Sequence, residues 1–162
     1  MIRTRQFAPG DGQGLAHTID AVCGEGRWMR TARFEPDALW EHAFANADCR
    51  CHLLLLAEDG RDIVGWCRVF PAGGDSDALL GIGLLAPYRD RGIGTDLIRR
   101  ALDWARQAGY RQVRLSTYAD NTRAIHVFQK CGFRFTMSPN GHLLEMTCDL
   151  ATEETPEEGG QS

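Results

Sequence analysis

The feature that most constrains the fold of this chain is an apolar strand that runs through a glycine-rich turn into an amphipathic helix. Residues 79–86 form an apolar run of strand length, and Pro87 ends it because proline cannot donate to a sheet ladder. The turn that follows reads RDRGIGT over residues 89–95. Apolar side chains then recur at helical spacing, at Ile93, Leu97, Ile98, Ala101, Leu102 and Ala105. The pattern predicts a strand–turn–helix unit with the turn at the N-terminus of the helix.

This turn has the chemistry of an anion site. The first N–H groups of a helix lack internal partners, and the helix dipole favours negative charge at that end. Gly92 and Gly94 carry no Cβ, so a ligand can approach the backbone closely, and Arg89 and Arg91 add positive charge. Together these groups would suit a phosphate or a pyrophosphate. The alternative is an ordinary strand-to-helix turn with surface arginines, because a short glycine pattern is weak evidence by itself.

Two motifs in the second half of the chain favour the binding interpretation. A Rossmann loop needs G-x-G-x-x-G and a P-loop ends in Gly-Lys-Ser/Thr, and the turn has neither. Residues 89–94, R-x-x-G-x-G, instead resemble the coenzyme A pyrophosphate motif of the GNAT superfamily of acyl-CoA N-acyltransferases. Residues 121–133, N-x-x-A-x-x-x-F-x-K-x-G-F, are similar to a second motif of that family, with tyrosine replaced by Phe128. The resemblance covers residues 78–135 most strongly.

The order of predicted elements agrees with that resemblance. Strands are expected at residues 3–7, 51–58, 62–70, 79–86, 111–118, 133–137 and 142–150, and helices at 11–23, 36–46, 92–108 and 121–130. Asp11 is expected to cap the first helix, Pro36 to occupy the first turn of the second, and Leu39 to face inward. The order β-α-α-β-β-β-α-β-α-β-β predicts an α/β (α+β) fold. It has a mixed, mostly antiparallel central sheet of about seven strands with helices on both faces, as in the GNAT fold.

By resemblance, the cofactor is acetyl-CoA (coenzyme A) and its pantetheine arm lies between two splayed central strands. Backbone groups of residues 83–85 would bind the arm, and the turn would hold the pyrophosphate. Asn121 would bond to the cofactor, cap a helix, or do both. The residues that the resemblance assigns to the cofactor are Gly83, Leu84, Leu85, Arg89, Asp90, Arg91, Gly92, Ile93, Gly94, Thr95, Asn121 and Phe128.

The catalytic groups depart from the family pattern. The backbone amide of Leu85 is the candidate to polarise the thioester, but Phe128 has no proton for the departing thiol. Ser116 stands where some relatives have a glutamate base. Three alternatives remain open: the thiolate leaves unaided, Tyr118 with Ser116 on the same strand face acts instead, or the protein binds acyl-CoA without transferring it.

The acceptor site is predicted in the loop after the first helix. Glu25 could attract an ammonium group, and Arg27 or Arg30 could hold a carboxylate. Trp28 adds an aromatic face, unless the loop is solvated and Trp28 packs into the core. The pairing suggests an amino-acid-like acceptor.

Composition limits the remaining classes. The chain has 162 residues and a formal charge of −4, which suits one domain and is unlike the strongly basic balance of nucleic-acid binders. We expect a single domain over residues 1–150 and an acidic, disordered tail over 151–162. With no apolar segment of signal-peptide length at the N-terminus and no run long enough for a membrane span, the predicted location is the cytoplasm.

The six cysteines are expected to be reduced thiols, mostly buried, as is usual in the cytosol. The segment Cys49-Arg50-Cys51-His52 invites a metal interpretation, but it has the wrong spacing for zinc and lacks a second ligand pair. No metal is therefore predicted.

The leading functional prediction is an acetyl-CoA-dependent N-acetyltransferase that moves an acetyl group to a primary amine of a small molecule, an amino acid among the candidates. Attack would be direct, within a ternary complex. The alternatives are a non-catalytic acyl-CoA sensor and an acetyltransferase of protein N-termini or lysines. The chain is expected to be a monomer or homodimer, with neither nucleic acid nor membrane as a partner.

Overall fold

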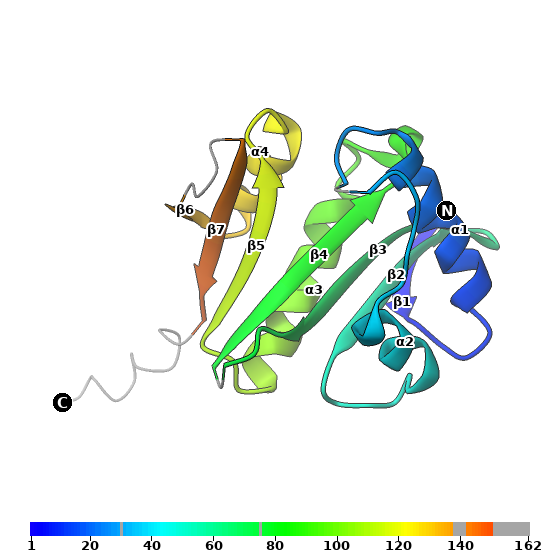
Figure 1. Cartoon of the computed structure of the whole chain (residues 1–162), viewed down its shortest axis with the longest axis horizontal. Helices are drawn as coiled ribbons and strands as arrows, with labels where there is room; N and C mark the ends of the chain where they lie inside the picture. The colour runs from blue at the N-terminus through cyan, green and yellow to red at the C-terminus, as the bar shows by residue number, and fades with distance from the viewer. Residues whose placement is uncertain (30, 75, 138–141, 151–162) are drawn as a thin grey trace.

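The protein folds as one mixed sheet with helices on both faces (Figure 1). The computed structural model describes residues 1–29, 31–74, 76–137 and 142–150. Within them the strands are β1 (Ile2–Gln6), β2 (Leu53–Asp59), β3 (Asp62–Pro71), β4 (Asp77–Leu84), β5 (Gln112–Tyr118), β6 (Arg134–Met137) and β7 (Leu143–Asp149). The helices are α1 (Gly12–Gly24), α2 (Ala38–Ala45), the short 3-10 helix η1 (Ala86–Tyr88), α3 (Ile93–Gln107) and α4 (Thr122–Lys130). The predicted order and fold class are confirmed.

The seven-stranded sheet has the order β1-β2-β3-β4-β5-β7-β6. Every neighbouring pair is antiparallel except β4 and β5, which run parallel. The hairpin between β2 and β3 turns at Gly60, whose φ of 64° lies in the left-handed region that glycine adopts freely. Gly109, with φ 94°, ends α3 in the same way. Both glycines lie in gaps between the elements predicted from the sequence.

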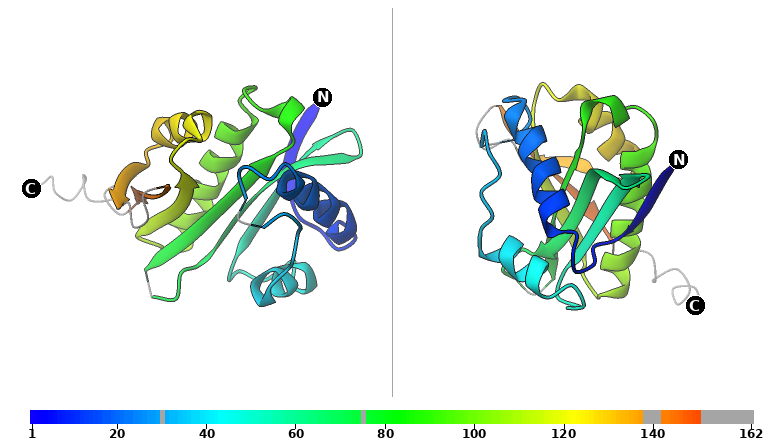
Figure 2. Two further views of the ribbon diagram at one scale, coloured as in Figure 1. Left: turned by 45° about the horizontal axis from the view of Figure 1, so that its top comes forward. Right: turned by 90° about the vertical axis from the view of Figure 1, so that its right-hand side faces the viewer.

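Two apolar cores cover the two faces of the sheet. Residues Leu53–Leu56 are buried, and alternate side chains along a strand point to opposite faces. Leu53 and Leu55 join the core under α3 and α4, whereas Leu54 and Leu56 join the core under α1 and α2. Figure 2 shows the helices on the two sides. The continuous leucine run is thus the mark of a strand that is buried on both faces.

Several local expectations are wrong. Asp11 does not cap α1, because its carboxylate binds Arg5 at 2.8 Å and accepts from the Ala8 amide. Helix α2 begins after Pro36, at Ala38, with the Asp37 side chain accepting from the Trp40 amide at 3.0 Å. Leu39 is 46% exposed, so it does not face inward.

The cysteines also differ from the prediction. Cys49 and Cys51 form a disulfide, because the tight bend at residue 50 brings their Cα atoms to 5.4 Å. The other four cysteines are free.

No helix among the described residues has both the length and the apolar character that crossing a bilayer requires. Residues 138–141, between the last two predicted strands, and the predicted tail at 151–162 lie outside the described residues.

Candidate functional site

The site begins where β4 and β5 separate. The two strands pair only from Asp77 to Leu79 on β4, and beyond that point they diverge (Figure 1). A cavity of about 530 Å³ occupies this region. Its wall includes Leu80 and Leu115 from the core under α3, and Val22 and Met29 from the α1 side. The cavity therefore passes through the sheet from one face to the other.

The glycine-rich turn forms one end of this cavity. Gly92, the N-cap of α3, has φ 84°, and Asp90 has φ 63°, a conformation uncommon outside glycine. Gly92, Gly94 and Thr95 line the cavity, and nothing lies within 4 Å of the place where a Cβ on Gly92 would stand. The first turn of α3, whose leading amides have no partner within the helix, thus faces a space that an anion can enter.

A second contact anchors the segment that leads into the turn. The Tyr88 hydroxyl donates to Asp59 Oδ2 at 2.8 Å, and the Arg91 guanidinium lies 5.2 Å from the Tyr88 ring centroid. This hydrogen bond raises the pKa of Tyr88 and lowers the pKa of Asp59. Both residues therefore keep their ordinary charge near neutral pH, and the contact that ties the turn to the β2–β3 hairpin is retained.

Arg89 links the turn to the α1 side of the molecule. Its guanidinium donates to the Leu84 carbonyl oxygen at 2.8 Å and to both carboxylate oxygens of Glu25, at 2.8 and 3.1 Å. Glu25 is thus committed to an ion pair rather than free for an acceptor ammonium group. The bidentate geometry fixes the end of α1 against the end of β4.

Other predicted cofactor residues have local partners as well. Asp90 forms an ion pair with Arg123 at 3.0 Å, and Asn121 caps α4 by accepting from the Ala124 amide at 3.4 Å. Asn121 also lines the cavity, so both of its expected roles remain compatible. Gly83 is glycine for a packing reason: a Cβ there would enter the Trp66 ring, its cross-strand neighbour.

The amide predicted to polarise the thioester is already engaged. Leu85 N–H donates to the Val64 carbonyl at 2.9 Å, which directs it toward β3. Backbone groups of successive strand residues point to opposite edges, so the amide of Leu84 points toward the gap. The Leu84 carbonyl, which Arg89 binds, points the same way. Leu84 therefore replaces Leu85 as the candidate donor.

The structure brings the candidate catalytic side chains to the same cavity. Ser116, Tyr118 and Phe128 all line it. Phe128 is buried and packs on Phe133, with ring centroids 6.0 Å apart. Glu145 lies opposite Ser116 on β7, and its carboxylate is paired with Arg114 at 3.1 Å. Only the β5–β7 register reveals this placement, and a single sequence does not contain that information.

The α1 end of the cavity contains one of the described residues that were predicted to bind the acceptor. Trp28 is half-buried and lines the cavity together with Met29, which the sequence analysis had not singled out. Arg27 is exposed and stacks on Trp28, 4.4 Å from the ring centroid. Arg30 lies outside the described residues. The described part of this end is thus an apolar wall rather than a pair of opposite charges.

The fold of acyl-CoA N-acyltransferases is defined by two parallel strands that splay apart within an otherwise antiparallel sheet. An anion-binding turn lies at the gap between these two strands. Residues 17–133 match the model of the Acetyltransferase (GNAT) family. The chain belongs to this family, and its predicted membership is confirmed.

Individual relatives agree with this assignment. A mycothiol acetyltransferase of Corynebacterium glutamicum (strain R) is 38% identical over 80 residues, which are 49% of this chain and 27% of that protein. This chain thus spans only about a quarter of that relative. A GNAT-family acetyltransferase from Streptococcus pneumoniae superposes with a TM-score of 0.79 at 20% identity, covering 91% of this chain and 98% of the other. The putative acetyltransferase yncA from Salmonella typhimurium, solved with its cofactor acetyl-CoA, gives 0.79 at 15% identity, covering 97% and 98%.

Proposed function

We propose that this protein is an acetyl-CoA-dependent N-acetyltransferase that acts on the primary amine of a small molecule. The observation that carries the proposal is the cavity through the sheet, with the α3 N-terminus at one end and Trp28 and Met29 at the other. A cofactor held at the first end would present its acyl group in the gap, where an amine entering from the second end could reach it. The acetyl-CoA bound to the structural relative yncA supports the choice of cofactor.

The chain supplies backbone donors for the cofactor. The amides of the first turn of α3 and the guanidinium of Arg91 would bind the pyrophosphate. The Leu84 amide would donate to the carbonyl oxygen, which gains negative charge as the amine attacks within the ternary complex. These groups are fixed before the substrates arrive, so little reorganisation is needed during the reaction.

Proton transfer requires a group other than residue 128. The amine must lose a proton to attack, and the thiolate must leave or be protonated. Tyr118 lines the cavity and carries a hydroxyl, so we assign it the role of acid toward the thiol. Ser116 lies on the same strand face as Tyr118. Its hydroxyl would hydrogen-bond the incoming amine or a water molecule bound to that amine.

The apolar wall at Trp28 and Met29 favours an acceptor with an apolar part beside its amine. Amino acids remain within this class, and two relatives are named after small molecules: one is a mycothiol acetyltransferase and another a spermidine N-acetyltransferase. A second candidate, an acyl-CoA sensor without transferase activity, is favoured by the lack of a hydroxyl at Phe128.

Acceptor-dependent release of CoA from acetyl-CoA tests the proposal. We expect turnover with at least one member of a panel of amino acids, amino sugars and polyamines, and none without acceptor. Tight acetyl-CoA binding in calorimetry without turnover on the panel would favour the sensor instead. Turnover on peptide N-termini or lysines alone would favour the protein-modifying alternative.

A further inference from the structure

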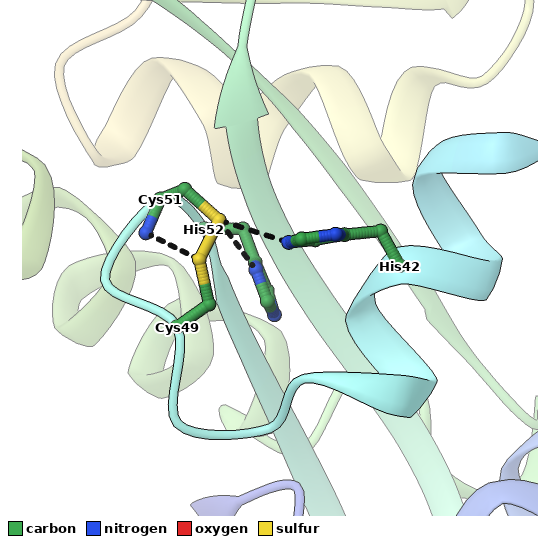
Figure 3. A group of neighbouring side chains, drawn as sticks. All are labelled: His42, Cys49, Cys51 and His52. Atoms are coloured by element: carbon green, nitrogen blue, oxygen red, sulfur yellow. Dashed lines mark hydrogen bonds between the residues drawn. A yellow bond between two sulfur atoms is a disulfide. The ribbon is translucent and has the colours of Figure 1, made fainter.

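A second group of chemically reactive side chains lies away from the cavity, where the end of α2 meets the start of β2 (Figure 3). We call it the His/Cys cluster; its members are His42, Cys49, Cys51 and His52. None of the four lines the cavity between β4 and β5. No metal was predicted here, because the spacing of residues 49–52 is wrong for zinc and a second ligand pair is lacking, but the fold supplies His42 from a different element.

The four side chains converge on one point. Their ligand atoms all lie within 4.8 Å of one another. His42 Nε2 and His52 Nδ1 approach Cys51 Sγ at 3.2 and 3.4 Å. A tetrahedral zinc site with Zn–S bonds near 2.3 Å and Zn–N bonds near 2.0 Å has ligand–ligand edges of about 3.3–3.8 Å. Small side-chain rotations would therefore convert the cluster into such a site.

Polar groups of neighbouring residues lie beside two of these ligands. The Asn46 side chain lies 3.2 Å from His42 Nδ1, the ring nitrogen that would remain free when Nε2 binds a metal. Metal binding through Nε2 places the hydrogen on Nδ1, and the Asn46 amide would rotate to accept it. The Cys51 N–H donates to Cys49 Sγ at 3.1 Å, as backbone amides do toward metal thiolates.

We propose that, after reduction of its disulfide, the His/Cys cluster binds one Zn²⁺ ion as a tetrahedral Cys₂His₂ site that ties α2 to β2. Two thiolates and two imidazoles form a donor set that zinc prefers, and tetrahedral geometry suits it. The ligand atoms belong to partly or fully exposed residues, so an ion can enter from solvent.

The disulfide and the metal exclude each other, because zinc binds cysteine as the thiolate and a sulfur in a disulfide carries no negative charge. A dithiol would transfer two electrons and two protons to Cys49 and Cys51, breaking their S–S bond while its own S–S bond forms. Zn²⁺ then displaces both thiol protons. The cluster thus has an oxidised, metal-free form and a reduced, metal-binding form.

Zinc titration of the full chain tests this proposal. The protein is reduced with a phosphine, desalted under argon and titrated with Zn²⁺ against a chromogenic chelator, and in parallel with Co²⁺. We expect one ion per chain and, with cobalt, the absorption bands of tetrahedral thiolate coordination. The oxidised chain keeps every side chain and should bind no ion at the same site.

Matched variants locate the site. Cys49→Ser and His42→Ala should weaken zinc binding at least about tenfold, a loss that removal of even an outer partner can cause. Cys131→Ser and His17→Ala, which lie outside the cluster, should leave it unchanged. The proposal is overturned if the reduced wild type binds zinc no more tightly than His42→Ala, or if cobalt shows no thiolate bands. None of these readouts depends on transferase activity.

Discussion

The two ends of the cavity are built in contrasting ways. The α3 end consists of backbone amides and glycines within one short segment, residues 91–95. The α1 end consists of side chains, those of Val22 on α1 and of Trp28 and Met29 in the loop after it, and the Glu25–Arg89 ion pair joins the end of α1 to the end of β4. The first end depends on the conformation of the chain, and the second on how distant segments pack. We therefore expect substitutions at the two ends to affect different kinetic constants.

The largest effect is expected for Gly92→Val. A β-branched residue at φ 84° is strained, and the altered turn would misdirect the amides toward the pyrophosphate. CoA binding in calorimetry should weaken by at least about 100-fold, the loss of one or two charge-assisted hydrogen bonds. Gly73→Val, at φ 102° in an exposed loop, imposes a similar strain outside the cavity and should leave CoA affinity unchanged. Equal losses in both variants would refute the binding role of the turn.

Tyr118→Phe should lower kcat about 100-fold, the lower end of the range for general acid catalysis, with CoA affinity unchanged. Phe128→Tyr in that background should restore part of the rate, because the hydroxyl returns to the cavity wall. An unchanged kcat in Tyr118→Phe, measured by stopped-flow with saturating acceptor, would show that the thiolate leaves unaided.

Glu25→Gln tests the connection between the two ends. Loss of the partly buried ion pair, worth about 1 kcal/mol, should raise the acceptor KM about fivefold and leave the CoA dissociation constant unchanged. Glu41→Gln, an exposed glutamate on α2, is the matched control. If CoA affinity falls as much as acceptor affinity, the two ends of the cavity do not bind their ligands independently.

A smaller effect is expected on the pH dependence of stability, through the ion pair between Arg5 and Asp11. The hydrogen bond from Arg5 lowers the pKa of Asp11, so its contribution to stability is complete above the unfolded pKa of about 4 and is lost as pH falls through the folded value. Asp11→Asn should therefore cost up to about 1 kcal/mol at pH 7 and almost nothing at low pH. Urea unfolding of both proteins at several pH values measures this difference, and a constant difference would contradict it.

The smallest effect is expected at Leu39, which is 46% exposed. Leu39→Ser should change the unfolding free energy by less than about 0.5 kcal/mol, as is usual at the surface. Leu97→Ala, at a fully buried position on α3, should cost about 2–5 kcal/mol. Thermal unfolding of both variants checks the contrast, and a large loss in Leu39→Ser would indicate that residue 39 is covered in solution.

The same contrast explains what the sequence could predict. The strand–turn–helix unit and its glycines are local, so residues 79–105 could be interpreted without knowledge of the fold. The Glu25–Arg89 pair joins residues 64 positions apart, and the approach of His42 to Cys51 depends on where α2 packs. The hydrogen bond that occupies the Leu85 amide depends on strand register. Such contacts follow from tertiary packing, which no local pattern encodes.

Hydrogen–deuterium exchange with and without CoA tests the central claim most directly. Our account predicts that CoA slows exchange of the amides at residues 91–95 and at the end of β4, because these donors then bind the cofactor. Unchanged exchange there, with CoA bound and protection confined to other segments, would contradict it.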